Sequence, residues 1–367
     1  MRVLHIIDTL WLGGAQTLER DYFEMQKDNH DLFLYVLRRS NPQITIQHEN
    51  IFVHNSFSRF SFFPILELKK IIRDNKIGLL HCHLLRSQLF GYLVKIFFFP
   101  SIKLVIHEQG DVIDSTWLSV PIIKLLKYRT DLFMTCSNAL KKSLQEKANI
   151  EPAKVYRLYN GIDLRKFNKQ IISWNVAEER RKIGIEENVF VVGFAGRLIE
   201  RKGWREFVEV AKKYANNASL KFLIAGEGVD RKELLTYISV NGLNDLIYIG
   251  YASNMQWFYS IIDCLVVPSH HEPMGMIIPE AQAMGVPVIA ANVDGLNEIV
   301  VNGNNVLLFK AKDIVSIELA LQRVINDKQL RDELIINGII NAEKYSIENY
   351  NKALDEIYSR LLKHKDQ

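Results

Sequence analysis

The fold class follows from the stretch VFVVGFAGRLIERKG, residues 189–203. Its first part, VFVVGFAG, is a short run of β-branched and other apolar residues, which predicts a strand. The glycines of GRLIERKG (196–203) end this run in a loop, and a segment of helical periodicity follows near 204–215. A strand, a loop and a helix in this order make one unit of a parallel α/β sheet.

The same order recurs along the chain. In the first half we expect strands at 3–8, 32–37, 78–83, 103–108 and 131–136, and helices near 15–27, 64–74, 84–98, 119–129 and 138–148. In the second half we expect strands at 189–196, 220–226, 246–250, 264–268, 287–291 and 306–309. Helices are expected there near 204–215, 230–241, 254–261, 277–285 and 312–326, with a helical tail at 328–366.

Two Rossmann-like doubly wound α/β domains are therefore the expected architecture, and a length of 367 residues also favours two domains. We place the N-terminal domain at 1–165 and the C-terminal domain at 166–345, with the terminal helix 346–367 packing back on the first domain. Ligands of such sheets bind beyond the carboxyl ends of the strands. A ligand held by both domains would therefore lie in a central cleft.

Charge is distributed unevenly. Residues 1–170 carry 24 Lys and Arg against 16 Asp and Glu, a net charge of +8, whereas the remainder carries 22 against 26, a net charge of −4. The first half also holds 13 of the 19 phenylalanines. This asymmetry predicts that the first half meets an anionic surface. The aromatic residues favour a membrane leaflet, and because no recognition motif is present, nucleic acid is not an expected partner.

Two segments carry this membrane prediction, FSRFSFFPILELKK (57–70) and VKIFFFPSIK (94–103). Their aromatic side chains could enter a membrane interface while cations contact lipid phosphates. The alternative is that many of these residues are core, Phe97 to Phe99 among them, because they end a helix. The cations of the two segments are Arg59, Lys69, Lys70, Lys95 and Lys103.

The remaining features indicate the compartment. Cys82, Cys136 and Cys264 stand singly in apolar runs, so we expect reduced, buried thiols of a cytosolic protein. MRVLHIIDTL has too short an apolar run for an export signal. No stretch approaches the roughly twenty apolar residues of a spanning helix. We expect a cytoplasmic protein, attached peripherally to the inner face of the plasma membrane.

Loops at the strand ends hold the candidate site residues. In GRLIERKG, Arg197 and Lys202 could bind a diphosphate, one as a planar fork and one as a mobile point charge, with Gly196 opening the loop. The alternative is a solvated basic loop. After the first strand, the glycine pair Gly13 and Gly14 allows a close backbone approach at a helix N-terminus. A tight turn without a ligand explains that pair equally well.

A further loop is HHEPMGMIIPEAQAMG, residues 270–285. Gly275 permits a tight turn, and Pro279 is tolerated because an N–H in the first helical turn has no intrahelical partner. Glu272 precedes the glycine and Glu280 lies about one turn into the helix, where it can accept hydrogen bonds from hydroxyls. As alternatives, Glu280 complements the helix dipole and Glu272 is a surface acid.

The last loop is HEQGD, residues 107–111, after the strand KLVIHE. His107 ends that strand, where its side chain can face the cleft, although a lone histidine is more often structural. On the acceptor side the candidates are Gly13, Gln16 and Asp111.

Together these loops resemble the retaining GT-B glycosyltransferases of the family 4 type. The most specific element is the E-x7-E pair within PSHHEPMGMIIPEAQAMGVPVIAANVDGLNEIV (268–300). GRLIERKG and NGID (160–163) stand in the order that the family shows. The resemblance covers nearly the whole chain, from the Gly13–Gly14 loop to the Asn302–Gly303 turn.

The resemblance implies transfer of a sugar from a nucleotide donor held mainly by the C-terminal domain. Arg197 and Lys202 should then bind the diphosphate, Glu280 the ribose hydroxyls and Glu272 the hydroxyls of the sugar. The backbone at Gly275, Met276 and Ile277 should contact sugar and phosphate. His107 should touch the donor sugar, and Gly14 should approach the phosphates.

The resemblance also implies retention of anomeric configuration, with the donor phosphate taking the proton of the acceptor. We find no Asp-x-Asp pair of the kind that metal-dependent transferases use, so cations alone should stabilise the leaving group, and neither a metal nor another cofactor is expected. The sequence departs from the family pattern at four points, which are Met274, Asp294–Gly295, Gln16 and Asn305.

The expected function is transfer of a hexose to a glycan or lipid-linked glycan in the assembly of lipopolysaccharide, O-antigen or capsule. A UDP-sugar is favoured as donor, and a GDP-sugar is the alternative. Rival functions are a sugar-nucleotide epimerase or a phosphorylase with this architecture, or a glycan-binding subunit without activity. Intact Arg197, Lys202, Glu272 and Glu280 oppose the last of these.

Overall fold

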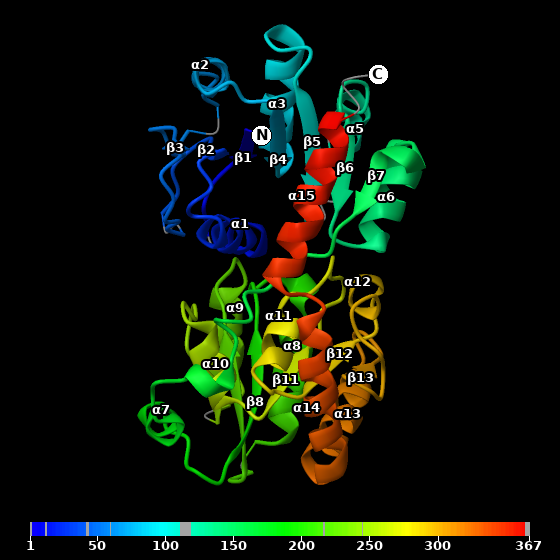
Figure 1. The fold of residues 1–367 in the computed structure, drawn as a ribbon. Coiled ribbons are helices and arrows are strands. Elements are labelled where there is room, and N and C mark those ends of the chain that lie inside the picture. Colours follow the sequence, from blue (N-terminus) through cyan, green and yellow to red (C-terminus); the bar gives the residue numbers. More distant parts are fainter. Residues whose placement is uncertain are drawn as a thin grey trace. The chain divides into compact units, whose positions relative to one another are not determined.

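The computed structural model describes residues 2–11, 13–41, 44–58, 60–110, 119–215, 217–243 and 245–363. The chain divides into two compact units, which we call unit 1 (Met1–Gly161 with Ile347–Gln367) and unit 2 (Ile162–Ser346). Each unit holds one sheet whose strand pairs are all parallel, with helices against it (Figure 1). Among the described residues, no helix combines the length and the apolar character needed to cross a membrane.

The sheet of unit 1 has the strand order β3-β2-β1-β4-β5-β6-β7. Its central strands β1 and β4 are fully buried and largely apolar, as expected for a parallel sheet covered on both faces, although they also contain buried histidines. The strands are β1 (Val3–Ile7), β2 (Leu32–Val36), β3 (Ile51–Val53), β4 (Leu79–His83), β5 (Lys103–Glu108), β6 (Leu132–Thr135) and β7 (Val155–Arg157). The helices are α1 (Gly14–Met25), α2 (Pro64–Asp74), α3 (Leu85–Phe97), α5 (Ser119–Leu126), α6 (Asn138–Ala148) and α15 (Ile347–Lys363).

Alternate residues of these strands enter two different cores. Leu4 and Ile6 point into a core formed with α2, α3, α5 and α6, whereas Val3 and Ile7 point into a core formed with α1 and α15. Tyr350 and other apolar residues of α15 are buried in this second core. The helix α15 therefore completes unit 1 although it follows unit 2 in the chain.

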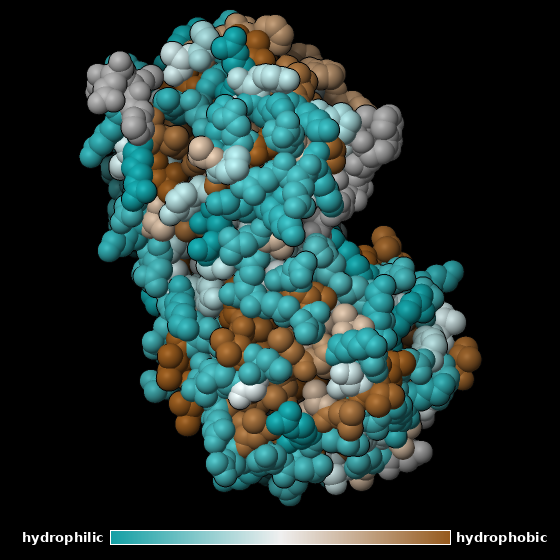
Figure 2. Space-filling model, turned by 90° about the vertical axis from the view of Figure 1, so that its right-hand side faces the viewer, coloured by the Kyte–Doolittle hydropathy of each residue, from teal (hydrophilic) through white to brown (hydrophobic). Residues whose placement is uncertain are grey.

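The sheet of unit 2 has the order β10-β9-β8-β11-β12-β13. Its strands are β8 (Phe190–Ala195), β9 (Leu220–Ala225), β10 (Leu246–Tyr248), β11 (Cys264–Val267), β12 (Val288–Ala291) and β13 (Leu307–Phe309). Its helices are α7 (Val176–Lys182), α8 (Trp204–Lys213), α9 (Arg231–Val240), α10 (Met255–Ile261), α11 (Ile277–Ala283), α12 (Asp294–Asn297), α13 (Ile314–Asn326) and α14 (Lys328–Glu343). Apolar side chains also reach the surface of this unit (Figure 2), among them Val315 and Leu319 of α13 and Ile336 of α14.

Two doubly wound parallel sheets confirm the predicted fold class. Several elements differ from the prediction, and the short helices α7 and α12 are among those that were not expected. The strands β3 and β7 were not expected, because each is a three-residue edge strand with exposed residues such as Phe52 and Tyr156 and therefore lacks a continuous apolar run. The expected helical tail 328–366 is two helices, α14 and α15, which belong to different units. The central cleft between the domains stays a prediction.

The cysteines are as predicted, since Cys82, Cys136 and Cys264 are free and buried.

Candidate functional site

The strand order of unit 2 places its candidate loops side by side. The chain runs from β8 to β9 on one side of the sheet, and β11 pairs with β8 on the other side. The loops after β8 and β11 therefore leave the sheet at the point where the strand order reverses, which is where doubly wound sheets bind ligands. These two loops, 196–203 and 268–276, carry six of the eight site residues predicted in unit 2.

The loop after β8 is fixed by backbone contacts to the loop after β9. Gly196 N–H donates to the Ala225 carbonyl over 3.0 Å, and Leu198 N–H donates to the Glu227 carbonyl over 2.9 Å. A Cβ atom on Gly226 would lie only 1.9 Å from the Gly196 carbonyl oxygen, so no other residue fits there. The position of Gly196 at the start of the candidate loop is thus set by its neighbour.

The same loop also contacts the loop after β11. Gly203 has φ +72°, and a Cβ atom there would lie 2.0 Å from the Pro268 carbonyl oxygen. The N–H of His270 donates to the Arg201 carbonyl over 2.8 Å. Between these contacts Glu200–Lys202 form one turn of 3-10 helix. Backbone contacts therefore hold Lys202 close to the β11 loop.

Lys202 and Glu272 form an ion pair that joins the two loops. Glu272 is buried, and the Ser269 hydroxyl donates to its Oε2 atom over 3.2 Å. A lysine ammonium has three N–H donors, so Lys202 can bind a second acceptor while it stays paired. The ion pair keeps a cation and an anion at the reversal point of the strand order.

Arg197 lies in the same loop and is exposed. Its pKa is lowered by partial desolvation and by the like charge of Arg201, while Glu272 opposes that shift. An arginine remains charged at neutral pH despite such a shift. Residues 196–203 carry three cations and one carboxylate, and Glu272 leaves a net charge of +1 at this edge of the sheet. Such a loop can attract an anionic group.

The turn before α11 is shaped by two glycines. Gly275 has φ +74°, and a Cβ atom there would lie 2.3 Å from Leu296 Cδ2. A Cβ atom on Gly295 would lie 1.9 Å from the Glu272 carbonyl oxygen. The start of α12 is therefore pressed against the loop that carries Glu272, which explains the need for Gly295 beside the unusual Asp294.

The helix α11 begins at Ile277, directly after Met276. Pro279 lies in its first turn, as predicted, where its missing N–H costs no helical hydrogen bond. Glu280 is half-buried, and the Tyr259 hydroxyl of α10 donates to its Oε2 atom over 2.8 Å. One carboxylate oxygen of Glu280 thus accepts a hydrogen bond from tyrosine.

Met274 and Asn305, two departures from the family pattern, are both buried within unit 2. The Asn305 amide oxygen accepts the N–H of Val301 over 2.9 Å.

In unit 1 the glycine pair stands at the start of α1. A Cβ atom on Gly13 would lie 2.5 Å from Gln16 Oε1, whereas a Cβ atom on Gly14 would meet nothing within 4 Å. Gln16 is buried and covers Gly13. A side chain at position 13 would require Gln16 to move, whereas packing within unit 1 places no restriction on position 14. Asp111 lies outside the described residues.

His107 differs from its prediction. The strand β5 continues to Glu108, and the His107 ring is completely buried, with its centroid 5.2 Å from that of His81 in a stacked arrangement. Burial lowers the pKa of His107, so the ring is neutral at pH 7. The reason is its position on the face that α1 and α15 cover. The side chain is enclosed within unit 1, and its contact with a donor sugar stays a prediction.

Sequence reasoning overlooked two hydrogen-bond partners and a cluster. Ser269 and Tyr259 hold Glu272 and Glu280, but a serine and a tyrosine carry no recognisable signal by themselves. The cluster is a set of buried histidines from neighbouring strands, which the alternation His81-Cys82-His83 in an apolar strand could have indicated.

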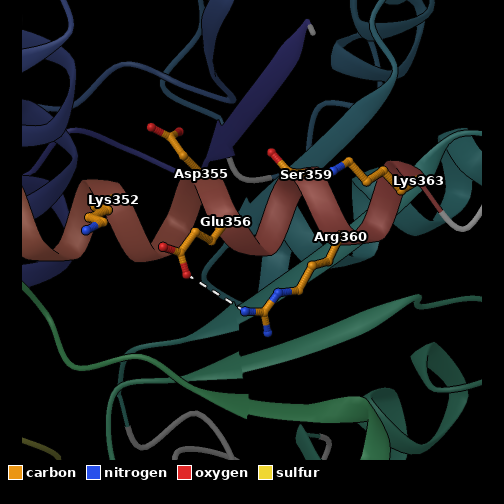
Figure 3. A pocket seen from close by; sticks show the side chains of 6 residues that line it. All are labelled: Lys352, Asp355, Glu356, Ser359, Arg360 and Lys363. Carbon is orange, nitrogen blue, oxygen red and sulfur yellow. Dashed lines mark ion pairs between the residues drawn. The ribbon is translucent and has the colours of Figure 1, made fainter.

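An open hollow lies along α15 (Figure 3), and it contains none of the predicted site residues. Glu356 and Arg360 form an ion pair of 3.8 Å across one helical turn there. The side chains come from one helix and are Lys352, Asp355, Glu356, Ser359, Arg360 and Lys363. Such a surface holds no converging set of groups, so it is not a candidate site.

Comparison with known families gives two matches that together span most of the chain. Residues 13–166 match the model described as Glycosyltransferase Family 4. Residues 175–340 match the model described as Glycosyl transferases group 1. The two matches correspond to the two sheets.

Similar proteins occur in archaea and bacteria. An uncharacterized glycosyltransferase of Methanocaldococcus jannaschii is 27% identical over 318 residues, which are 83% of this chain and 82% of the relative. The UDP-Gal:alpha-D-GlcNAc-diphosphoundecaprenol alpha-1,3-galactosyltransferase of Escherichia coli is 25% identical over 357 residues, 90% of this chain and 89% of the relative.

Among solved structures, the Anabaena protein HepE in complex with UDP and glucose superposes with a TM-score of 0.85 at 20% identity. The match covers 98% of this chain and 100% of HepE. At this identity the likeness shows a shared fold.

Proposed function

Because this chain belongs to the GT-B glycosyltransferases of the family 4 type, we propose that unit 2 binds a nucleotide-sugar donor and that unit 1 binds a glycan or lipid-linked glycan acceptor. The observation that carries this proposal is the Lys202–Glu272 ion pair beside Arg197, where the strand order of unit 2 reverses. A diphosphate and a hydroxylated sugar need cations and a carboxylate close together, and this edge offers both.

Each group at this edge has a proposed role. Arg197 and Lys202 bind the diphosphate and stabilise its charge as it departs. Glu272 accepts hydrogen bonds from hydroxyls of the sugar. Glu280 accepts them from the ribose, and the Tyr259 hydroxyl orients its carboxylate. The backbone at Gly275, Met276 and Ile277 contacts sugar and phosphate.

In the proposed reaction the bond between the anomeric carbon and the diphosphate oxygen breaks, and a bond from that carbon to an acceptor oxygen forms on the same face of the sugar. The acceptor proton passes to an oxygen of the departing diphosphate, and the configuration is retained. Arg197 and Lys202 supply the positive charge, so we propose that the step proceeds without a metal.

We propose a UDP-hexose as donor and a lipid-linked glycan as acceptor, in the assembly of a cell-surface polysaccharide. Two findings support this choice. The E. coli relative is named for a UDP-sugar donor and a diphosphoundecaprenol-linked acceptor. HepE, which shares the fold, was solved with UDP.

We further propose that unit 1 contacts an anionic membrane through an aromatic surface, which consists of Phe57, Phe60, Phe62, Phe63, Leu66 and Phe97. These side chains are 60–88% exposed, and such a concentration of exposed apolar groups favours an interaction site. Lys69 and Lys70 of α2 are exposed next to it, and the Lys69 ammonium lies 4.5 Å from the centroid of the Phe98 ring. These cations can contact lipid phosphates.

Parts of the sequence prediction for this surface change. Lys95 and Lys103 both pair with Asp131, so they are engaged within the fold rather than offered to lipid. Of Phe97 to Phe99, only Phe99 packs against the core, while Phe97 is 70% exposed. Helix α3 ends at Phe97, and the ring therefore lies beyond the buried part of the helix. Arg59 lies outside the described residues.

A thermal-shift screen against UDP, GDP, ADP and their common sugars tests the donor site. We expect one nucleotide to raise the Tm of the wild-type protein and to have a smaller effect on Glu280→Gln, which keeps a hydrogen-bond acceptor for Tyr259. If no nucleotide raises the Tm, a glycan-binding subunit becomes the better explanation. If the protein instead consumes a nucleotide sugar without any acceptor, an epimerase becomes the better explanation.

Co-sedimentation with vesicles tests the aromatic surface separately. Wild-type protein should bind phosphatidylglycerol vesicles at low salt, and Phe60→Ser/Phe62→Ser should bind less. Tyr128→Ser is the matched control because Tyr128 is also exposed on unit 1, at 72%. Equal binding of both variants would contradict a membrane role for this surface.

A further inference from the structure

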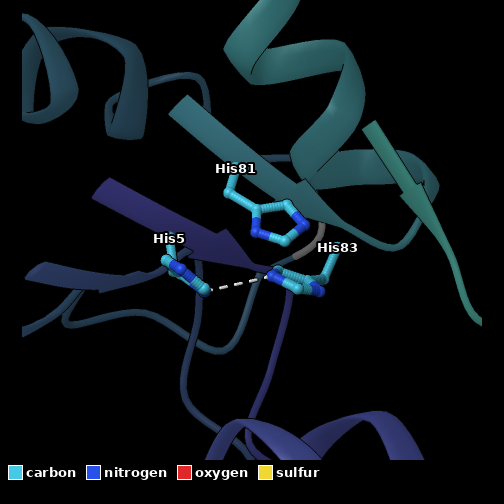
Figure 4. A group of neighbouring side chains, drawn as sticks. All are labelled: His5, His81 and His83. Atoms are coloured by element: carbon cyan, nitrogen blue, oxygen red, sulfur yellow. Dashed lines mark hydrogen bonds between the residues drawn. The ribbon is translucent and has the colours of Figure 1, made fainter. Parts of the chain in front are cut away.

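Three histidines of unit 1 come together in the interior of that unit. His5 lies on β1, and His81 and His83 lie on the adjacent strand β4, with His5 and His81 directly paired in the register. All three are completely buried, and their rings lie close together (Figure 4). They lie on the face of the sheet that α1 and α15 cover. Glu19 of α1 reaches the same point and is also completely buried.

The separations among His5, His83 and Glu19 are close to those of metal ligands, and a nitrogen of His81 lies near enough to join them. His5 Nδ1 lies 2.8 Å from Glu19 Oε2 and 3.2 Å from His83 Nε2, and His83 Nε2 lies 3.1 Å from Glu19 Oε1. One nitrogen from each of the three histidines lies within 4.8 Å of the other two. A tetrahedral zinc ion with bonds of about 2.0–2.1 Å holds its ligand atoms roughly 3.3 Å apart.

The outer ring nitrogens have the partners that metal-binding histidines usually have. His83 Nδ1 lies 3.4 Å from Gln109 Oε1, and His5 Nε2 lies 3.0 Å from the Tyr358 hydroxyl. His81 Nδ1 bonds to the same hydroxyl. Histidine ligands of metals commonly use their second nitrogen in this way, which fixes the ring.

Two polar atoms of the cluster lack a hydrogen-bond partner in the part of the chain that the structure describes. They are His81 Nε2 and Glu19 Oε1, both are buried, and Glu19 Oε1 has only its ion-pair contact of 3.1 Å to His83 Nε2. Buried polar atoms are normally hydrogen-bonded, so two such atoms in one cluster need an explanation. Coordination to an ion would satisfy a nitrogen and a carboxylate oxygen together.

We propose that His5, His81, His83 and Glu19 bind one divalent transition-metal ion, with Zn²⁺ as the first choice. Imidazole and carboxylate are ordinary zinc ligands, and four protein ligands without an open position are typical of a structural site. Neutral imidazole is the form that binds metal.

Such an ion would tie several elements of unit 1 together. It would link β1, β4 and α1 through its ligands and α15 through Tyr358, which bonds to two of them. From the sequence we expect no metal in the transfer reaction, and that proposal is unchanged. The ion would instead stabilise the fold of unit 1.

The test uses the full chain without an affinity tag. The protein is incubated with ZnCl₂, desalted and analysed by mass spectrometry of the metal, and we expect about one Zn²⁺ per chain and a Tm raised by several degrees. Replacement by Co²⁺ should give the visible absorption of a tetrahedral cobalt site. His81→Gln and Glu19→Gln should lose this binding, whereas His30→Gln should keep it because His30 is exposed at the surface of unit 1.

If the ligand variants fail to fold, the wild-type protein alone decides the question. A chelator should then lower its Tm, and added Zn²⁺ should restore it. Failure to retain Zn²⁺ together with an unchanged Tm would overturn the proposal. The cluster would then be held together by hydrogen bonds alone. Retention of equal Zn²⁺ by all three variants would also overturn it, because the metal would then lie elsewhere. Neither result would affect the donor site, which the nucleotide screen tests independently.

Discussion

A buried glutamate stands near the carboxyl edge of each sheet, and the two differ in how their charge is balanced. Glu272 in unit 2 pairs with Lys202 and accepts the Ser269 hydroxyl. Glu108 in unit 1 accepts a bond of 2.9 Å from the Gln88 amide, and its other carboxylate oxygen has no hydrogen-bond partner among the described residues. Burial raises the pKa of Glu108 to about 7.

The difference separates a site from a core. An acid that is buried without a cation becomes partly neutral, and it then contributes little to binding a ligand. An acid that is paired with a cation near the surface can bind a ligand, because groups of the ligand can replace part of the ion pair. The comparison predicts that changes near Glu272 affect activity first and that changes at Glu108 affect stability and its dependence on pH.

Lys202→Met is the strongest way to break the comparison. We expect kcat/KM to fall about 10²–10³-fold, because a cation that stabilises a departing diphosphate is lost. Steady-state kinetics with the donor identified by the thermal-shift screen measures this. Lys213→Met is the matched control, since Lys213 forms an ion pair with Glu318 outside the loop. A similar loss in both variants would show that the ion pair only stabilises unit 2.

Gly203→Ala tests whether the loops of unit 2 are fixed by backbone contact. We expect the free energy of unfolding to fall by about 3 kcal/mol, because the new methyl group meets the Pro268 carbonyl in a left-handed backbone. Gly184→Ala is the control, since Gly184 has φ +77° but open space around it, and should cost only about 1 kcal/mol. Urea unfolding measures the free energy of unfolding of both variants. Equal losses would mean that the loop around Gly203 moves to accommodate the methyl group.

Glu108→Gln sharpens the comparison through pH. The folded-state pKa of Glu108 lies above its unfolded value, so the folded protein binds the extra proton and loses stability as pH rises from about 4.5 to 7. The neutral glutamine should therefore raise the free energy of unfolding by about 2 kcal/mol at pH 8 and by much less at pH 5. Urea unfolding at both pH values checks this. An equal gain at both would remove the charge explanation.

Gly14→Ala should give the smallest effect. Nothing lies within 4 Å of the new methyl group, and alanine suits the first turn of α1, so stability should change by less than about 0.5 kcal/mol. If a donor phosphate approaches this backbone, kcat/KM should still fall about tenfold. Kinetics and a melting curve on the same sample separate the two. Unchanged kinetics would remove Gly14 from the donor site.

The fold was predictable where the chain alternates long apolar runs with helical periodicity. The central strands of both sheets lie within two residues of their expected positions, because burial on both faces demands continuous Val, Ile and Leu. The strands β3 and β7 were missed because edge strands can be short and partly exposed. Their pairing depends on neighbours that are distant in the sequence.

The candidate site was predictable in position but not in its contacts. The two motif loops of unit 2 are adjacent, as the doubly wound order requires, yet the Lys202–Glu272 pair joins residues 70 positions apart. Lys95 and Lys103 looked available for lipid, but Asp131 from another part of the sheet binds both. Such partners depend on strand order and register rather than on local sequence.

The buried histidines illustrate the same limit. The alternation of His81 and His83 with a cysteine in an apolar strand could have indicated two histidines on one buried face, but it does not name their partners. Only the register of β1 against β4 brings His5 beside them.

The position of α15 has a consequence for synthesis on the ribosome. Unit 2 is inserted between two parts of unit 1, and its two ends meet where Ile162 N–H donates to the Tyr345 carbonyl over 2.7 Å. At 5–20 residues per second, translation of unit 2 takes roughly 10–40 s. During this time one face of the nascent first sheet is covered by α1 but still lacks α15. A chaperone that shields exposed apolar strands has its longest opportunity to bind in this interval, before Tyr350 and Tyr358 arrive to close the core.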